Sequence, residues 1–421
     1  MPIFVTNSIV RKLLVILRII IFQLFRCARA IINFASTEWS WQCRIKDLKK
    51  FLILFADKKL SLIINTLNYL MNKIIFILLL FTFYKPTFAQ QSYKSAIIAF
   101  YNCENFYDTI DNPLVNDDDF TPHGDKNYNS SIYWNKVEHL ATVLSQIGAE
   151  VNPDGPAIIG VAEIENDTVL NDLVNHPLLK NRNYKIVHYD SRDIRGIDVA
   201  LIYNPKYFSV ETSKKLFVHL PSGAKEAIFT RDILYVKGKL GGETIHVFVN
   251  HWPSKRGGEE RSAPGREAAA QVDKNFIDSL EKMDTNAKII VMGDLNDDPV
   301  STNLTKVLRA KSKIEDVHRG ELYNPWVDLY RRGIGTLAYD DAWGLFDQII
   351  INYPWLNKGQ QGFFYYRQSI FNKPFMIENL GKYKGYPMRT WDGNTYRGGY
   401  SDHFPTYLIM LKKLTIMSSR E

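Results

Sequence analysis

The sequence predicts an α/β fold: a four-layer α/β sandwich of two mostly antiparallel sheets flanked by helices. Two observations lead to this prediction. Short runs rich in Ile, Val, Phe and Tyr recur along the chain between turn residues, as strands do. Segments with apolar residues at helical spacing are fewer and lie between these runs. No internal repeat or low-complexity linker interrupts residues 92–421, so we expect a single domain there.

The expected elements follow from these two periodicities. The clearest helix covers residues 134–147, where Trp134, Val137, Leu140 and Leu144 fall on one helical face. Further helices are expected over 267–280 and 301–308. The expected strands cover 96–101, 157–162, 184–189, 198–203, 233–236, 244–250, 288–292, 346–351 and 406–411.

Residues 71–90, MNKIIFILLLFTFYKPTFAQ, have the layout of a secretory signal peptide. Lys73 gives a positive start, an apolar core of about ten residues follows, and a small-residue site ends at Ala89. We therefore expect residues 71–89 to direct Sec-type export to the periplasm or the medium. Because such a signal begins at the initiator methionine, we interpret residues 1–70 as a start site assigned too early. The alternative is a disordered or membrane-associated extension.

The charge distribution supports this division of the chain. Residues 1–89 hold 13 of the 52 Lys and Arg and 3 of the 45 Asp and Glu, which leaves 39 basic and 42 acidic residues beyond them. The overall charge of +7 therefore does not indicate a nucleic-acid partner for residues 90–421, whose net charge is −3. Cys103 is the one cysteine after Ala89, which excludes a disulfide framework and a cysteine-based zinc site there.

Polar residues follow several of the expected strands. Asn102 and Glu104 lie two apart, and so share a strand face, and Glu163 comes directly after an apolar run. Asp294 and Asn296 repeat the two-residue spacing after a later run. Each has a structural alternative, because the sequence around Asp294 also suits a turn that caps a helix, and Glu163 suits a solvated strand end.

Two histidines accompany these residues. His251 ends one expected strand, and His403 follows Asp402 just before the last. An isolated histidine is more often structural than catalytic. However, Asp347 lies inside an apolar run, and a buried carboxylate needs a partner. His403 is the partner we expect.

The residue types suit metal-assisted hydrolysis of a phosphate ester. Asn102, Glu104 and Glu163 offer the hard oxygen ligands that Mg²⁺ and Mn²⁺ prefer. Asp294 could orient or deprotonate a water molecule. Either histidine could donate to a phosphate oxygen as negative charge develops.

Six motifs in order, FYNCENFYD, VAEIEN, NHWPSKRGG, GDLNDDP, FDQI and SDHFPTY, resemble the endonuclease/exonuclease/phosphatase superfamily with its DNase I-like fold. Any one motif is weak, but the set spans nearly all of residues 95–411 and is specific. Their form is most similar to the exported bacterial branch. The resemblance implies one catalytic domain over residues 90–421.

The resemblance also implies roles for individual residues. Glu104 stands where Asp is common, and Ala162 stands where Gln usually precedes the metal-binding Glu163. The implied cofactor is Mg²⁺, with Mn²⁺ or Ca²⁺ as alternatives. The implied metal ligands are Asn102, Glu104, Glu163 and Asp402, and the implied catalytic residues are His251, Asp294, Asn296, Asp347 and His403.

The substrate is less well defined, since this superfamily acts on nucleic acids, lipids and small phosphates. Local basic residues favour a nuclease with DNA or RNA as its partner, whereas the net charge of −3 favours a phosphatase or phospholipase C-like enzyme. We expect a monomer with no protein partner and no membrane span in the mature chain. The candidate phosphate-binding residues are Arg195, Lys255, Arg256 and Arg266, although Glu259 and Glu260 could offset them.

Overall fold

The protein is described by a computed structural model. The chain divides into two units, Met1–Ala89 and Gln90–Glu421. In the first unit, residues 71–76 are helical, and the rest of the expected signal peptide lies outside the described residues. Among the described residues, no helix is both long and apolar enough to cross a membrane. The structure describes residues 91–221, 229–359 and 361–414, together with helical stretches at 57–58, 61–62 and 64–76.

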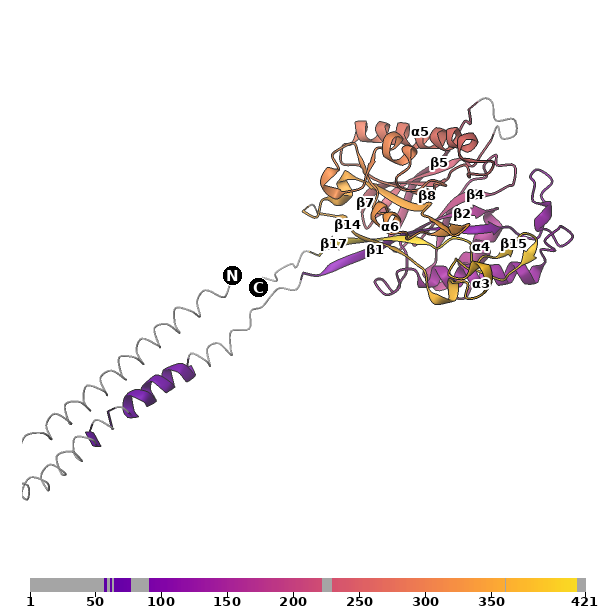
Figure 1. The fold of residues 1–421 in the computed structure, drawn as a ribbon. Helices are drawn as coiled ribbons and strands as arrows, with labels where there is room; N and C mark the ends of the chain where they lie inside the picture. Colours follow the sequence, from indigo (N-terminus) through magenta and orange to yellow (C-terminus); the bar gives the residue numbers. More distant parts are fainter. Residues whose placement is uncertain are drawn as a thin grey trace, which may run out of the picture. The chain divides into compact units, whose positions relative to one another are not determined.

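The second unit contains a six-stranded sheet, called sheet A here (Figure 1). Its central strands β1 and β2 are parallel, and its other neighbours are antiparallel. In order across the sheet, the strands are β14 (Phe363–Ile370), β17 (Thr406–Lys413), β1 (Tyr93–Phe106), β2 (Ile158–Ile164), β4 (Asp198–Tyr203) and β3 (Lys185–His188).

Sheet B has seven strands and, like sheet A, contains a central pair of parallel strands. Strands β7 and β8 are parallel, as are the short β10 and β9, and the other pairs are antiparallel. The strands in order are β5 (Phe208–Leu216), β6 (Ile233–Leu240), β7 (Glu243–His251), β8 (Lys288–Asp294), β13 (Asp347–Asn352), β10 (Leu322–Tyr323) and β9 (Ala310–Lys311). Two small hairpins complete the set, β11 (Leu337–Tyr339) with β12 (Ala342–Gly344) and β15 (Trp391–Asp392) with β16 (Thr395–Tyr396).

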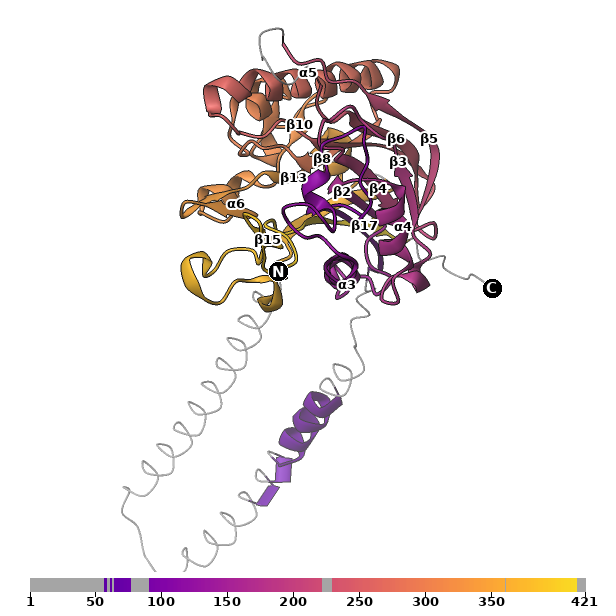
Figure 2. The same ribbon diagram turned by 90° about the vertical axis from the view of Figure 1, so that its right-hand side faces the viewer.

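The two sheets face each other and helices cover their outer faces (Figures 1 and 2). Phe100 and Leu408 of sheet A share one buried cluster with Val249 and Met292 of sheet B. A second cluster joins sheet A to α3 (Ser130–Gln146) and α4 (Asp167–Asn175), and a third joins sheet B to α5 (Glu259–Met283). The short α6 (Val327–Arg331) follows β10. The predicted four-layer α/β sandwich is confirmed.

Most of the expected elements are present with shifted ends. Helix α3 begins where the side chain of Asn129 accepts hydrogen bonds from the next turn, and its apolar face packs on sheet A. The helix expected over 267–280 is the second part of the longer α5. The segment expected as a helix over 301–308 is instead a π-helical turn at Asn303–Val307.

The strand directions bring the polar motifs to one edge. Parallel strands β1 and β2 both end there, and so do β7 and β8. The antiparallel partners β13 and β17 begin at the same edge, because Asp347 pairs with Asp294 and Thr406 pairs with Phe100. Six segments that are distant in sequence therefore meet at this edge.

Candidate active site

Sheet A contributes the acidic half of the site. The backbone leaves strand geometry here, because Glu104, Asn105 and Glu163 all have positive φ angles, of 49°, 52° and 58°. Such angles are unfavourable for residues other than glycine and tend to be kept at functional sites. The Asn105 N–H donates to Glu163 Oε2 at 2.9 Å, which ties the ends of β1 and β2 together.

Glu104 is buried and firmly held. Its two carboxylate oxygens accept hydrogen bonds from the backbone N–H groups of Thr390 (2.7 Å) and Trp391 (3.1 Å). Burial and the neighbouring charge of Asp402 raise the pKa of Glu104 to about 7. The ammonium group of Lys136, buried nearby, opposes this shift and donates to Thr390 Oγ1 (2.6 Å).

Asp294 lies at the centre of the site, at the end of β8. Its Oδ2 accepts from Asn102 Nδ2 and its Oδ1 accepts from the Asn296 N–H, both at 3.0 Å. Asn296 is held in turn, since its Nδ2 donates to the Trp252 carbonyl at 3.0 Å. Burial raises the pKa of Asp294 to about 7, although His403 acts in the opposite direction. A carboxylate with that pKa suits general-base chemistry near neutral pH.

His403 is oriented by the fully buried Asp347, as the sequence predicted. His403 Nδ1 lies 2.7 Å from Asp347 Oδ2, and its Nε2 points toward Asp294 Oδ2 at 4.0 Å and Asp402 Oδ1 at 3.8 Å. Burial lowers the pKa of His403, but the charges of Asp347, Asp402 and Asp294 and the hydrogen bond to Asp347 together outweigh it and raise the pKa well above the usual range. His403 is therefore an imidazolium at neutral pH.

His251 has the opposite electrostatic environment. Its Nε2 lies 3.7 Å from Glu163 Oε1 and 3.8 Å from Asp294 Oδ2. Burial and the positive charges of Arg231 and Arg195 lower the pKa of His251 well below its usual range. The site thus holds one neutral and one charged histidine, an arrangement that assigns different roles to the two rings.

The donor set fits a hard divalent cation. Glu163 Oε1 accepts no hydrogen bond from the described residues, and Asp402 has a partly exposed side chain. Asn102 Oδ1 and the Glu104 carboxylate lie beside them on β1 and its extension, although both already accept backbone hydrogen bonds. Carboxylate and amide oxygens without cysteine are the ligands of Mg²⁺ or Mn²⁺.

The four candidate phosphate-binding residues do not form one surface. Arg266 is fully buried in α5, where it is paired with Glu259 and with Asp297 Oδ1 at 2.9 Å, so it braces the loop after β8 and does not face the edge. Lys255 is partly exposed but lies within 4.0 Å of three carboxylates. Arg256 is exposed. Arg195 is the one of the four whose charge reaches Glu163.

Sequence reasoning missed three residues that support the site. Lys136 lies on the apolar face of α3, and a lone lysine at such a position is a signal that could have revealed it. Arg231 donates to Asp193 Oδ2 (3.0 Å) and to the Trp252 carbonyl (2.7 Å) behind His251. Ser401 joins Asn102 to His403 through two hydrogen bonds, at 2.8 and 3.1 Å.

Comparison with known proteins identifies the family of the chain. The model of the endonuclease/exonuclease/phosphatase family matches residues 97–413. The chain therefore belongs to this family, whose members are phosphoric ester hydrolases that use divalent metal ions. No curated protein matches the chain.

Several solved structures are similar to the chain. One is an endonuclease/exonuclease/phosphatase family protein from Bacteroides thetaiotaomicron, with 16% identity and a TM-score of 0.48 over 77% of this chain and 100% of that chain. A mannosyl-6-phosphatase from the same species has 15% identity and a TM-score of 0.46, over 76% and 100%. TDP2 from D. rerio, complexed with a single-strand DNA product, has 11% identity and a TM-score of 0.44, over 75% and 99%.

Proposed function

We propose that this protein is an exported, Mg²⁺-dependent nuclease that hydrolyses DNA or RNA by in-line attack of water. The observation that carries the proposal is the placement of Asp294 between a neutral histidine, His251, and a positively charged one, His403. Such a site offers a base for water and a cation for the phosphate within a few ångströms. Export rests on the signal peptide expected over residues 71–89.

The acidic half of the site would hold the metal ion. Glu163, Glu104, Asp402 and Asn102 are the residues that would bind it, and the ion would supply Lewis-acid polarisation of the phosphate. Asp294 is fixed by Asn102 and Asn296 so that its carboxylate faces the same space. It would take the proton of the attacking water.

The two histidines would act on the phosphate itself. The His403 imidazolium, held by Asp347, would donate from Nε2 to a non-bridging oxygen as charge develops. The neutral His251 would donate a second hydrogen bond from Nε2 without adding charge beside Glu163. Both donors are preorganised by burial, so they need little rearrangement during the reaction.

A hollow near the site supports a nucleic-acid substrate. Its volume is about 260 Å³. The ring of Trp343 lies between the hollow and the site: its centroid is 6.0 Å from that of Tyr386, which lines the hollow, and 6.3 Å from that of Phe404, which follows His403 in the sequence. Aromatic rings that stack on bases and cations that meet phosphates are typical of single-strand binding. The hollow is lined by Ala338, Tyr339, Asp340, Asp341, Lys382, Tyr383, Tyr386 and Arg389.

The proposal is tested by substrate preference in a chromogenic and a nucleic-acid assay. We expect Mg²⁺-dependent cleavage of a labelled oligonucleotide that exceeds cleavage of small phosphomonoesters by at least about tenfold in kcat/KM. Tyr339→Ala, whose ring is largely exposed, should weaken oligonucleotide cleavage and leave a small diester unaffected. Oligonucleotides left intact with Mg²⁺, Mn²⁺ and Ca²⁺ would refute the nuclease.

One observation favours a second candidate, a phosphatase or phospholipase C-like enzyme. Arg266 is buried and Lys255 lies among carboxylates, so the loop after β7 offers less positive charge to a polyanion than its sequence suggests. Extended polyanions normally need more phosphate contacts than this. Release of inorganic phosphate or phosphocholine across a substrate panel, without oligonucleotide cleavage, would establish this candidate.

A further inference from the structure

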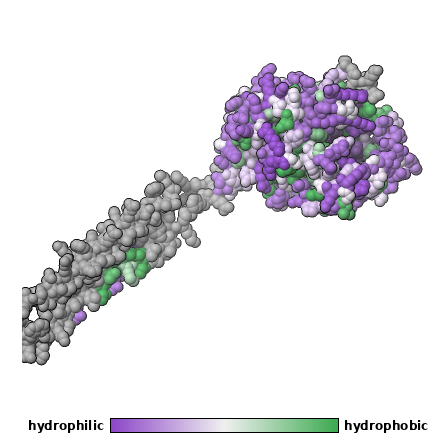
Figure 3. Space-filling model, viewed as in Figure 1, coloured by the Kyte–Doolittle hydropathy of each residue, from purple (hydrophilic) through white to green (hydrophobic). Residues whose placement is uncertain are grey.

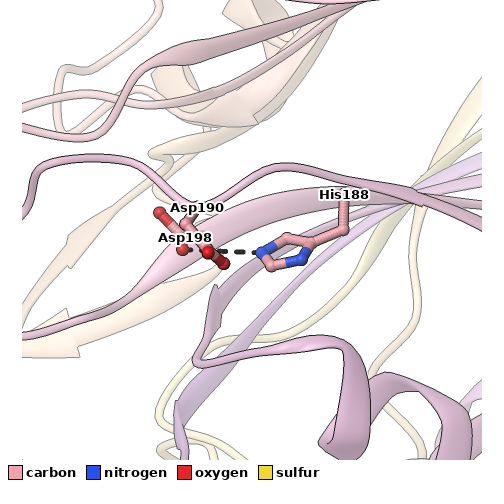
Figure 4. Close-up of side chains that lie close together, drawn as sticks. All are labelled: His188, Asp190 and Asp198. Carbon is pink, nitrogen blue, oxygen red and sulfur yellow. Dashed lines mark ion pairs between the residues drawn. The ribbon is translucent and has the colours of Figure 1, made fainter. Parts of the chain in front are cut away.

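A second cluster of metal-ligand side chains lies at the two ends of the β3–β4 connection, where Asp198 pairs in register with Ile164 of β2. His188 ends β3, Asp190 follows it, and Asp198 begins β4 (Figure 4). One potential ligand atom from each residue lies within 4.8 Å of the other two. His188 Nε2 faces Asp198 Oδ2 at 3.5 Å, and Asp198 Oδ1 accepts from the Ser191 N–H at 2.9 Å.

The histidine of this cluster is built like a metal ligand. Its side chain is only 2% exposed, and its Nε2 has no hydrogen-bond partner among the described residues. Its Nδ1 lies 2.9 Å from Asp167 Oδ1 at the start of α4. A metal-binding histidine typically donates its second N–H to a carboxylate, which fixes the ring and its tautomer. Asp167 fills that role and leaves Nε2 aimed at two acids.

The electrostatic field at this ring favours a cation. Carboxylate oxygens face both of its nitrogens, with Asp167 Oδ1 2.9 Å from Nδ1 and Asp198 Oδ2 3.5 Å from Nε2. The side chain of Asp190 is exposed, and it has no hydrogen-bond or ion-pair partner among the described residues.

We propose that His188 Nε2, Asp190 and Asp198 bind a divalent transition-metal ion of the Zn²⁺ type, at a site separate from the active site. One imidazole nitrogen with two carboxylates suits Zn²⁺ better than Mg²⁺, which prefers oxygen ligands alone. The two carboxylates are accessible, because Asp190 and Asp198 both line a hollow of about 700 Å³. Water would complete the coordination.

The ion would fasten both ends of the loop 190–198. This loop carries Asp193, which pairs with Arg231, and Arg195, whose charge reaches Glu163. Its far side is held by the Tyr107 hydroxyl, which donates to the Arg195 carbonyl at 2.8 Å. A metal ion at the base of the loop would therefore stabilise the position of two active-site cations without touching substrate.

The test is calorimetric titration of the EDTA-treated full-length protein with Zn²⁺, in a Glu163→Gln background that weakens the active-site metal. We expect one remaining Zn²⁺ site. Asp190→Asn and His188→Gln should each weaken it at least tenfold. Asp316→Asn, which changes an exposed acid in another part of the chain, should bind Zn²⁺ normally.

Thermal melting separates lost binding from lost folding. Because Asp190 is exposed and unpaired, Asp190→Asn should melt within about 1 °C of its parent in EDTA. Zn²⁺ should raise the melting temperature of the parent and of Asp316→Asn but not that of Asp190→Asn. Unchanged Zn²⁺ binding in Asp190→Asn, or no Zn²⁺ site left in the Glu163→Gln parent, would overturn the proposal.

Discussion

The two parallel strand pairs at the centre of the molecule can be compared directly. In sheet A, β1 and β2 end in Asn102, Glu104 and Glu163. In sheet B, β7 and β8 end in His251 and Asp294, which pair in register. Both pairs end at the same edge of the molecule. The β1–β2 pair ends in side chains that offer oxygen ligands to a metal ion, whereas the β7–β8 pair ends in a histidine and an aspartate that suit proton transfer.

The difference lies in the residues that surround the two strand ends, because burial raises the pKa of both Glu104 and Asp294 to about 7. The backbone at the end of sheet A turns through the positive φ angles of Glu104, Asn105 and Glu163, which brings oxygens together. The end of sheet B receives Asp347 from its antiparallel neighbour β13, and His403 from the segment before β17 of sheet A. After burial, the charges of these two residues act on the pKa of Asp294, whereas Arg231 and Arg195 are the main charges that lower the pKa of His251. A symmetric scaffold thus carries an asymmetric site, in which the proposed function would place metal binding at the ends of β1 and β2 and proton transfer at Asp294 of β8.

The largest effect should come from Asp294→Asn. The amide keeps the shape of the side chain but cannot accept a proton from water, so turnover should fall about 10³-fold or more. Metal affinity should stay within about threefold, because the base belongs to the proton-transfer half. Turnover of a chromogenic phosphodiester, with metal titrated, measures both; a variant with over a tenth of the parent activity would contradict the assignment.

His403→Ala should cost both activity and stability. Turnover should fall about 10²-fold, and the free energy of unfolding should fall by about 3 kcal/mol, because Asp347 is fully buried and loses its partner. Adding Asp347→Asn should restore much of the stability and none of the turnover. Denaturant unfolding of the two single variants and the double variant gives the coupling between the residues. Additive losses would mean that the pair is not coupled.

Glu163→Gln should act chiefly on the metal. We expect the Mg²⁺ concentration for half-maximal activity to rise about 10–100-fold, with a smaller loss of turnover at saturating metal. Glu165→Gln is a matched control two positions away. Burial raises the pKa of Glu165 to about 8, so this carboxyl group is mostly protonated at neutral pH and the amide replaces it closely. Equal metal requirements in both variants would remove Glu163 from the metal site.

The smallest effect concerns Asp273 of α5, behind the end of β7. Burial raises the pKa of Asp273 well above its usual range, and neither of its oxygens has a hydrogen-bond partner among the described residues. The folded state therefore binds this proton more tightly than the unfolded state, and the resulting stability is lost as pH rises above about 4.

Asp273→Asn removes that titration. From pH 4 to pH 8, the parent should lose at least about 1.4 kcal/mol of unfolding free energy relative to the variant, which corresponds to one unit of pKa difference. Urea unfolding at several pH values measures this difference. A constant difference across the range would show that Asp273 titrates normally.

The sequence was sufficient to predict the sandwich and the six segments of the site, because strand ends and polar residues are local signals. It did not reveal strands β5 and β14, which lie at the edges of their sheets. It also misplaced Arg266, since a basic residue beside a basic loop looks exposed until Asp297 is seen to pair with it. Pairing, burial and positive φ angles at Glu104 and Glu163 depend on tertiary contacts that sequence spacing does not encode.

The hydropathy of the surface does not single out one binding face. In the view of Figure 3, hydrophilic residues cover most of the second unit and hydrophobic ones are scattered among them. Scattered apolar residues are normal for a folded domain and indicate no particular partner.

The most direct measurement is nicking of supercoiled plasmid by the purified protein, with Mg²⁺ or with EDTA, beside Asp294→Asn and Glu163→Gln. The account predicts nicking that requires Mg²⁺, is nearly abolished in Asp294→Asn at every Mg²⁺ concentration, and is partly recovered in Glu163→Gln by excess Mg²⁺. Nicking that persists in EDTA, or identical metal responses in the two variants, would contradict the division between a metal-binding sheet and a proton-transfer sheet.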